Sequence, residues 1–406
     1  MSVYLLATLD TKGREAAFVR SVLAGAGVDV KIVDVGCLGS PAIAADISRE
    51  ELFAAAGHSL GELVAAADRG RAVTAAAEAA AALIVRLHAE GKVSGVLALG
   101  GSAGTTIGTA AMRALPLGVP KVMVSTLASG QVRHYVGDKD IFMLNSVLDI
   151  SGVNRISRLV LGEAARAMAG MASFPQPPAA GADKPLVAAS MFGVTTPCVE
   201  RARELLEAAG YEVLVFHATG NGGLAMESLI ADGLFAGVLD ITTTELADEL
   251  VGGLLSAGSQ RLTAAGRAGV PQVVSVGATD MVNFHAPETV PERFRDRTFY
   301  RHNANVTLMR TTAEENARIG ADLGGKLAAA TGPTALVLPL RGVSAIDREG
   351  QPFDDPAARR RLFQTLRQSA GEVETIELDC HLNDPEFAET AAKKLLELMR
   401  AGARKR

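Results

Sequence analysis

Short apolar runs alternate with longer helical patterns along nearly the whole chain, and this alternation constrains the fold more than any other feature. In the first half, apolar runs at residues 3–8, 28–33, 96–99 and 119–124 alternate with helical patterns at residues 14–26, 64–90 and 155–171. Short strands that are apolar on both faces belong to parallel sheets covered by helices on both sides. We therefore expect an α/β protein of two Rossmann-like domains, each a mainly parallel sheet with helices on both faces.

A segment rich in proline and small residues marks the boundary between the two expected domains. With 406 residues, the chain exceeds the size at which a single hydrophobic core usually stops growing. Residues 175–185 contain four prolines, which is typical of an exposed linker. The alternation of strands and helices resumes after this segment. The sequence therefore predicts domains at residues 1–174 and 186–406.

Charge and cysteine content exclude several classes of protein. The chain has 40 basic and 45 acidic residues, a net charge of −5, which gives no electrostatic basis for general nucleic-acid binding. Cys37, Cys198 and Cys380 lie too far apart for a zinc knuckle or a disulfide framework and fit a reducing cytoplasm. We also expect no secretory signal and no membrane span, because the chain starts with a strand-like run and charge or glycine interrupts its apolar stretches.

The run of glycine and hydroxyl residues at positions 100–106 is the best candidate for an anion site. It follows an apolar strand and precedes a helix, so backbone N–H groups and the positive end of the helix dipole can meet a phosphate. The run matches neither the P-loop nor the G-x-G-x-x-G pattern, and a tight strand-to-helix turn explains the same glycines. The residues expected to contact a nucleotide here are Gly100, Gly101, Ser102, Gly104, Thr105 and Thr106.

Turns after three neighbouring strands supply further polar groups to the same expected crevice. Helix capping alone explains Asp10 and Thr11, whereas Lys12 either faces a phosphate or is a surface lysine. Asp34 ends the second strand, where an acid can bind a ribose, although an acid at a strand end is common. The predicted nucleotide site is completed by Asp10, Thr11, Lys12, Gly36, Ser125 and Thr126.

In the second half of the chain, polar side chains gather at or just after strand ends. Four of the seven histidines, at positions 217, 285, 302 and 381, fall there. Paired histidines and carboxylates can bind a divalent metal or transfer protons, and an arginine can clamp a carboxylate or phosphate. A structural polar network explains the same residues, and the sequence identifies no metal ligand set. The candidate catalytic residues are His217, Glu245, Asp280, His302, Asn303, Arg341 and His381.

Several long motifs give the chain a family resemblance. They are LATLDTKG at residues 6–13, LALGGSAGTT at 97–106, VPKVMVST at 119–126, FHATGNGG at 216–223, and the His-Asn pair at 302–303. With these motifs the sequence resembles the Tm-one-like ATP-binding family over nearly its whole length. The resemblance implies two α/β domains, ATP with Mg²⁺ in the first domain, and a dimer or larger assembly.

Three hypotheses about function follow. The leading one is an ATP- and Mg²⁺-binding cytosolic protein whose second domain acts on or senses a small anionic metabolite at the cluster of histidine, acidic and arginine residues. The alternative is a non-catalytic regulatory or protein-binding module whose dimer ATP stabilises. The third is a dinucleotide-dependent dehydrogenase with Asp34 at the ribose, which the imperfect glycine spacing disfavours. Whether the protein is an enzyme stays open at this point.

Overall fold

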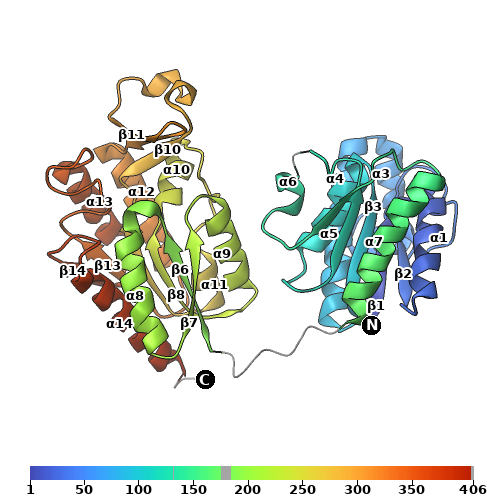
Figure 1. The fold of residues 1–406 in the computed structure, drawn as a ribbon, viewed down its shortest axis with the longest axis horizontal. Coiled ribbons are helices and arrows are strands. Elements are labelled where there is room, and N and C mark those ends of the chain that lie inside the picture. Colours follow the sequence, from blue (N-terminus) through green and yellow to red (C-terminus); the bar gives the residue numbers. More distant parts are fainter. Residues whose placement is uncertain (131, 175–183, 404–406) are drawn as a thin grey trace. The chain divides into compact units, whose positions relative to one another are not determined.

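A computed structural model describes the chain except for residue 131, residues 175–183 and residues 404–406 (Figure 1). The chain divides into two compact units, Met1–Pro178 and Ala179–Arg406. We describe each unit by itself as the N-terminal and the C-terminal domain. The predicted linker, residues 175–185, lies outside the described residues apart from its last two positions.

The N-terminal domain contains one five-stranded sheet in the order β2-β1-β3-β4-β5, and all its strand pairs are parallel. The strands are β1 (Ser2–Ala7), β2 (Val30–Asp34), β3 (Val93–Gly100), β4 (Lys121–Ser125) and β5 (Phe142–Asn145). Both faces of the sheet are buried. In β3, for example, Val96 and Ala98 pack into one core while Leu97 and Leu99 pack into the other. This two-sided burial explains why the strands are continuous apolar runs.

Helices cover both faces of this sheet. They are α1 (Leu9–Gly25), α2 (Arg49–Ala55), α3 (Leu60–Ala66), α4 (Arg69–Ala89), α5 (Ser102–Arg113), α6 (Arg133–Val136) and α7 (Arg155–Ser173). Helices α1 and α7 bury residues such as Val19 and Leu161 on one face. Helices α2, α4 and α5 bury residues such as Phe53, Ala76 and Ile107 on the other.

The C-terminal domain contains a six-stranded parallel sheet in the order β14-β13-β9-β8-β6-β7. Its strands are β6 (Leu186–Met191), β7 (Glu212–His217), β8 (Phe235–Thr242), β9 (Gln272–Gly277), β13 (Thr334–Pro339) and β14 (Glu374–Leu378). A separate antiparallel sheet, in the order β10-β12-β11, lies in the chain between β9 and β13. It is formed by β10 (Met281–Phe284), β11 (Phe299–Asn303) and β12 (Val306–Arg310).

Helices again cover both faces of the larger sheet. They are α8 (Thr196–Ala208), α9 (Asn221–Ala231), α10 (Thr244–Val251), α11 (Ala264–Ala268), α12 (Ala313–Ala328), α13 (Pro356–Ser369) and α14 (Pro385–Ala403), with short 3-10 turns η1 (Gly193–Thr195), η2 (Pro287–Thr289) and η3 (Glu292–Phe294). Helices α8 and α14 pack on one face, and α10, α12 and α13 on the other. The predicted fold class is therefore confirmed for both domains, whereas the antiparallel sheet was not predicted.

Both parallel sheets follow one topological rule, and this rule locates a crevice in each. Within each domain the second strand of the chain lies at the edge, followed by the first, the third and the fourth. Helices α1 and α5, which follow β1 and β3, pack on opposite faces, and so do α8 and α10, which follow β6 and β8. Ligands in such sheets bind outside the carboxyl ends of the two strands between which the connections diverge. These are β1 and β3 in one domain and β6 and β8 in the other.

Among the described helices, α4 is long and apolar enough to span a membrane by length and composition alone. Its Ala72, Ala76, Ala80 and Ile84 are buried in the core that covers one face of the N-terminal sheet. An alanine-rich face packed on a sheet is the pattern of a core helix.

Candidate functional sites

The glycine turn between β3 and α5 has two structural glycines. An ideal Cβ on Gly100 would lie 2.8 Å from the Cα of Gly104, and one on Gly104 would lie 3.0 Å from the carbonyl oxygen of Leu99. Neither position has room for a side chain. These two glycines therefore allow α5 to approach the end of β3 closely, which is the role of a tight strand-to-helix turn.

Gly101 is different, because no close approach requires it to be glycine. Its φ is −79°, and the atom nearest to an ideal Cβ is the Thr126 Oγ1 at 3.7 Å. Gly101 is also the N-cap of α5, and among the described residues no side chain caps this helix. The first-turn amides of α5, together with the exposed Ser102 and the partly exposed Thr126, therefore form the part of the turn that is open to an anion.

The buried hydroxyls of the turn bind the protein itself. Thr105 Oγ1 donates to the Gly101 carbonyl at 2.8 Å and lies 2.7 Å from Ser125 Oγ. Ser125 Oγ in turn accepts from the Leu127 N–H at 2.9 Å. Thr106 Oγ1 donates to the Ser102 carbonyl at 3.0 Å. Thr105 and Ser125 thus join the turns after β3 and β4 rather than facing solvent.

The turn after β1 brings Asp10 and Lys12 to different neighbours. Asp10 Oδ2 accepts from the Gly39 N–H at 3.0 Å, in the loop after β2. An ideal Cβ on Gly36 would lie 3.1 Å from the nearest Asp10 oxygen, so Gly36 provides room for that carboxylate. The backbone φ and ψ of Lys12 are not helical, and its Nζ donates a hydrogen bond to the Ile150 carbonyl. Thr11 is exposed and lies within 3.0 Å of the Thr8 hydroxyl.

Asp34, considered above as a ribose ligand, is fully engaged inside the domain. It is 1% exposed, and its Oδ1 accepts from the Leu9 N–H at 3.0 Å and the Gly36 N–H at 2.9 Å. Its Oδ2 pairs with Arg49 Nε at 2.9 Å. The carboxylate therefore holds the start of α1 and the loop after β2 together. This arrangement leaves it no free oxygen for a ribose hydroxyl and disfavours the dehydrogenase hypothesis.

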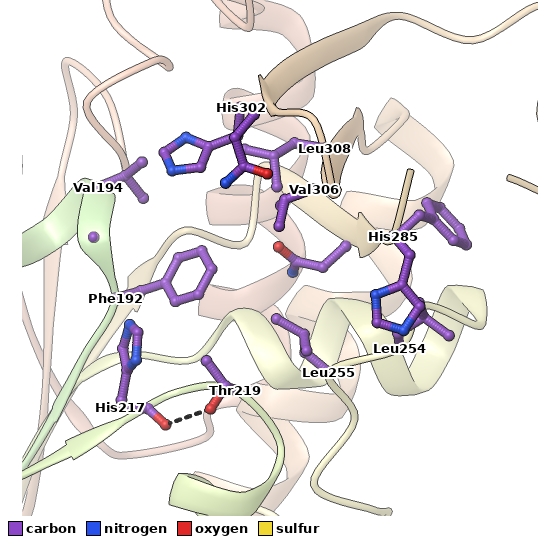
Figure 2. Close-up of a pocket in the computed structure, with 14 residues that line it drawn as sticks. Phe192, Val194, His217, Thr219, Leu254, Leu255, His285, His302, Val306 and Leu308 are labelled. Atoms are coloured by element: carbon purple, nitrogen blue, oxygen red, sulfur yellow. Dashed lines mark hydrogen bonds between the residues drawn. The ribbon is translucent and has the colours of Figure 1, made fainter. Parts of the chain in front are cut away.

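The C-terminal domain has a cavity of about 370 Å³ at the carboxyl ends of β6 and β7, beside the antiparallel sheet (Figure 2). Three histidines, two amides and one hydroxyl line it together with apolar side chains. The lining residues are Phe192, Gly193, Val194, His217, Thr219, Leu254, Leu255, Asn283, Phe284, His285, His302, Asn303, Val306 and Leu308. None of them is an aspartate, a glutamate, a lysine or an arginine.

Six segments of the chain position these side chains, among them β12, which supplies Val306 and Leu308. The turn after β6 supplies Phe192, and β7 ends in His217, whose ring lies 5.4 Å from that of Phe192 (Figure 2). The loop after α10 supplies two leucines, and His285 directly follows β10. Strand β11 supplies His302 and Asn303. The structure thus brings together three of the predicted catalytic residues, His217, His302 and Asn303.

Glu245 does not line the cavity but supports one of its walls. Its Oε1 accepts from the N–H groups of Gly220 and Gly223 at 2.7 and 3.1 Å, and its Oε2 accepts from Arg261 Nε at 2.6 Å. Burial raises the pKa of Glu245, and the positive charge of Arg261 opposes this increase. The carboxylate therefore fixes the turn that follows His217, and it occupies the amide donors that an anion would use.

Arg261 is at the centre of a buried group that we call the Arg261 cluster, formed by Arg261, Glu227, Asp240 and Glu245. Arg261 has no exposed surface and donates to Asp240 through two nitrogens, at 2.5 and 2.7 Å. It also reaches Glu227 at 3.1 Å. Ser190 Oγ, from the end of β6, donates to Asp240 at 2.6 Å. This network fills the crevice between β6 and β8 with protein side chains.

Asp280 and His381 are also buried away from the cavity. Ser344 Oγ donates to Asp280 Oδ2 at 2.8 Å, and burial together with the nearby Asp347 raises the pKa of Asp280. His381 Nδ1 accepts from the Asn383 N–H at 3.0 Å, so its Nε2 carries the proton and donates to the Ser344 carbonyl at 2.8 Å. Burial lowers the pKa of His381. Both residues connect the loops after β9, β13 and β14 and do not face a ligand site.

Arg341, predicted to clamp an anion beside the histidines, is not part of the cavity lining. Its side chain is 65% exposed and forms two hydrogen bonds with Asp379, at 2.8 and 2.6 Å. Both residues lie just beyond strand ends, as predicted, but at the β13–β14 side of the sheet. The predicted catalytic set therefore separates into cavity residues, buried supports and a surface ion pair.

No metal site emerges in the part of the chain that the structure describes. There, no three residues among His, Cys, Asp and Glu gather closely enough to hold a metal ion. The three cavity histidines come from three different segments and line separate parts of the wall. The arrangement therefore suits hydrogen bonding and proton transfer by individual imidazoles.

Asn283 lines the cavity, and Asp248, which sequence reasoning missed, holds Asn283 from behind the lining. Asp248 accepts from the Asn283 N–H at 2.9 Å and from Asn283 Nδ2 at 2.6 Å, and burial raises its pKa to about 7. One signal was available in the sequence. Glu245 and Asp248 are three residues apart, so two acids share the inner face of a short apolar helix.

The fold and the cavity define a protein of two parallel α/β domains, with an open glycine turn in the first and a small-molecule-sized cavity in the second. Residues 1–177 match the N-terminal domain and residues 184–399 the C-terminal domain of the uncharacterised protein family UPF0261. The chain belongs to this family.

Relatives extend over the whole chain. The UPF0261 protein of Clostridium tetani is 50% identical over 399 residues, covering 98% of each chain. The UPF0261 protein RA0729 of Rhizobium meliloti is 50% identical over 394 residues, covering 96% of this chain and 97% of its own. The ToMV resistance protein Tm-1 of Solanum lycopersicum is 43% identical over 351 residues, which are 84% of this chain and 47% of that protein. The resemblance to Tm-one-like proteins is thus confirmed as a relationship.

Solved structures give only a distant likeness. A UDP-N-acetylglucosamine 2-epimerase from Rickettsia bellii aligns over 99% of this chain and 96% of its own at 10% identity, with a TM-score of 0.22. A likeness at this level carries no argument about function.

Proposed function

We propose that this protein binds a small organic anion in the C-terminal cavity and ATP with Mg²⁺ at the glycine turn of the N-terminal domain. The observation that supports the first part is a cavity of about 370 Å³ at the carboxyl ends of the strands, whose titratable lining residues are all histidines. Such concave, mostly apolar sites with a few convergent polar groups are typical of small-molecule binding.

The composition of the lining favours an anion with an apolar body. Carboxylates are absent from the lining residues, so a cationic ligand finds no charged partner in the wall. Protonated imidazoles at His217, His285 or His302 attract a negative group, and Phe192 and the leucines pack against carbon atoms. If the protein is an enzyme, His217 is the group we assign to proton transfer, because it lies at a strand end against the ring of Phe192.

Three features support nucleotide binding in the N-terminal domain. The glycine turn lies at the carboxyl end of β3, beside the point where the connections of the sheet diverge. The first turn of α5 is uncapped within the described residues, so its amides and dipole favour a phosphate. Ser102 and Thr126 offer hydroxyls there, and Asp10 offers a carboxylate at the neighbouring turn. Mg²⁺ would be held mainly by the phosphates of ATP together with these oxygens.

A non-catalytic, oligomeric role is the second candidate, and the edge of the N-terminal sheet favours it. Strand β5 forms this edge, and Phe142, Val147 and Leu148 on the strand and the following loop are 50%, 66% and 41% exposed. An apolar sheet edge is a natural surface for pairing with a second copy. Phe142→Lys should then shift the protein toward the monomer in analytical ultracentrifugation, and an unchanged mass would argue against this interface.

The three cysteines support a reducing compartment, which we propose is the cytoplasm. Cys37, Cys198 and Cys380 are all unpaired and buried. Burial raises the pKa of each thiol, which keeps the thiolate, and hence the reactivity, low.

The test of the small-molecule site begins with a thermal-shift screen of carboxylate and phosphate metabolites against the full-length protein. Calorimetry then measures the best ligand with His302→Ala and His217→Ala, each of which should weaken binding about tenfold through loss of a charge-assisted hydrogen bond. Arg341→Ala is the matched control, because this exposed residue lies outside the cavity lining. If Arg341→Ala loses binding while both histidine variants keep it, the site is misplaced. Incubation of the ligand with ATP then distinguishes turnover from simple binding.

A further inference from the structure

Asn283 is a buried amide in the cavity wall whose orientation is fixed by its neighbour. The residue is 2% exposed, and its backbone N–H and its Nδ2 donate to the two oxygens of Asp248 at 2.9 and 2.6 Å. The ionised carboxylate of Asp248 only accepts hydrogen bonds, so above the pKa of about 7 that burial gives Asp248 the amide turns its NH₂ group toward it. The Oδ1 atom of Asn283 is consequently directed away from this pair.

That Oδ1 atom is an unused acceptor. It is buried, and it has no hydrogen-bond partner among the described residues. A buried acceptor without a partner costs about 1–3 kcal/mol, so folded proteins rarely retain one without a purpose. The polar side chains of the lining, such as His285 and Asn303, therefore make no hydrogen bond to it.

We infer that the cavity selects ligands that carry a hydroxyl or N–H donor on an apolar body, with Asn283 as the acceptor and Asp248 as the residue that positions it. This inference rests on the proposed small-molecule site and adds the chemical class of its ligand. Because Oδ1 has almost no accessible surface in the unliganded cavity, the Asn283 side chain turns slightly toward the ligand when a ligand donor satisfies this oxygen. A ligand that presents only an acceptor there meets two opposed oxygen dipoles and leaves both unsatisfied.

Asp248 lies behind the cavity lining and is held in a way that suits this role. It also accepts from the Leu255 N–H at 3.4 Å, so one carboxylate joins the loop after α10 to β10. An ideal Cβ on Gly253 would lie 1.8 Å from Asp248 Oδ1, so only glycine permits the contact. Replacing Asp248 by asparagine adds an NH₂ group that requires an acceptor. The Asn283 amide then turns over and presents its NH₂ group where Oδ1 was.

The experiment uses two small probes with the full-length protein at about pH 8.5, where Asp248 is ionised, and measures their dissociation constants by ¹⁹F NMR. 4-Fluorophenol carries a donor, whereas 4-fluoroacetophenone offers only an acceptor. We expect the wild-type protein to bind the phenol about three- to tenfold more tightly than the ketone, in line with one net hydrogen bond. In Asp248→Asn the preference should disappear or reverse. In the matched control Glu249→Gln, at the next and exposed position of the same helix, it should stay as in the wild type.

Each outcome decides a separate point. Both probes could bind equally to the wild type and compete with the ligand found in the metabolite screen. This result would support the small-molecule site but contradict the preference for ligands that carry a donor. An ordered water on Oδ1 would produce this result. If neither probe binds up to its solubility limit, the proposed site itself fails and the inference with it. If Asp248→Asn keeps the wild-type preference while remaining folded, Asp248 does not position Asn283.

Discussion

The two domains of this protein share one strand order, but different groups lie at the crevice of each sheet. In the N-terminal domain the crevice beside β3 is bordered by an uncapped helix and a glycine whose side-chain position is open. In the C-terminal domain the corresponding crevice beside β8 is filled by the Arg261 cluster, and Glu245 occupies the amides of Gly220 and Gly223. One topology therefore leaves the crevice open beside backbone donors in one domain and fills it with buried side chains in the other, although α10, which follows β8, also starts without a side-chain cap among the described residues.

This difference determines what each domain can bind. Free amides at a helix start recognise a phosphate by its charge and make few demands on the rest of the ligand. A cavity displaced from the filled crevice, and lined by side chains of six segments, recognises the shape and hydrogen-bonding pattern of a whole molecule. A shared fold thus says little about shared function, because function depends on the groups at the strand ends.

The largest expected effect is on the stability of the C-terminal domain. Arg261→Met removes the one cation that faces Asp240, Glu245 and Glu227 in the cluster. We expect this domain to lose about 3–5 kcal/mol of stability, because unpaired carboxylates stay buried. Urea unfolding followed by methionine methyl NMR, with Met309 reporting on the C-terminal and Met123 on the N-terminal domain, measures the loss.

Arg49→Met is the control in the N-terminal domain. Arg49 pairs with a single carboxylate, Asp34, which keeps two backbone donors when the arginine is removed. The loss there should be about 1–3 kcal/mol. Equal losses in the two domains would show that the cluster is no more important to stability than an ordinary buried ion pair.

Stability should also depend on pH in opposite directions in the two domains. Burial raises the pKa of Asp248 from 3.8 to about 7, so the folded C-terminal domain holds a proton that the unfolded chain has lost between those values. Its stability should fall by about 4 kcal/mol as the pH rises from about 4 to about 7, and then stay level. In the N-terminal domain a hydrogen bond from Ser2 lowers the pKa of Asp29, so that carboxylate loses its stabilising effect only as the pH falls below about 4.

The same methyl signals, recorded in urea at several pH values, measure both trends. Asp248→Asn should reduce the slope of the C-terminal domain, to which the buried Asp280 also contributes, and leave that of the N-terminal domain unchanged. A C-terminal domain that gains stability between pH 4 and pH 7 would show that Asp248 is already ionised in that range.

A substitution at Gly101 separates folding from nucleotide binding. Aspartate there should cap α5 and keep or slightly raise the melting temperature, since Gly101 has an extended conformation and free space for a Cβ. The same carboxylate should repel a phosphate and weaken ATP binding about tenfold or more. Calorimetry with ATP and Mg²⁺ measures the affinity.

The uncharged cap Gly101→Asn provides the matched control. The asparagine side chain fills the same space and carries no charge, so we expect a smaller loss of ATP affinity at a similar melting temperature. Unchanged ATP affinity in a folded Gly101→Asp protein would place the nucleotide elsewhere or exclude it.

The sequence predicted the fold because two-sided burial leaves a clear pattern of continuous apolar strands. It did not predict the antiparallel sheet, since β11 is mostly polar and exposed from Arg301 to Asn303 and lacks that pattern. Parallel strands end at the same edge of a sheet, so the place of His217 in the cavity followed from its position at the end of β7, whereas His302 reaches the cavity from the antiparallel β11, which this rule does not cover.

The roles of individual polar residues were harder to predict. Glu245, Asp280 and His381 occupy strand ends just as His217 does, but each is held by hydrogen bonds below the surface. Sequence position does not show whether a polar group faces a ligand or a neighbouring loop. The apolar half of the cavity wall, including Phe192, was equally hidden, because its residues resemble those of any core.

The smallest expected effect concerns Lys12, for which the sequence allowed two interpretations, a phosphate ligand or a surface lysine. Its Nζ donates to the Ile150 carbonyl, so the ammonium group holds the loop before α7 rather than the turn after β3. Lys12→Met should therefore change ATP affinity less than threefold and cost about 1 kcal/mol of stability through the lost hydrogen bond. Calorimetry and urea unfolding on the same sample separate the two effects. A loss of ATP affinity as large as that of Gly101→Asp would mean that the lysine leaves Ile150 when the nucleotide binds, and the N-terminal site would then use a side-chain cation as well as backbone donors.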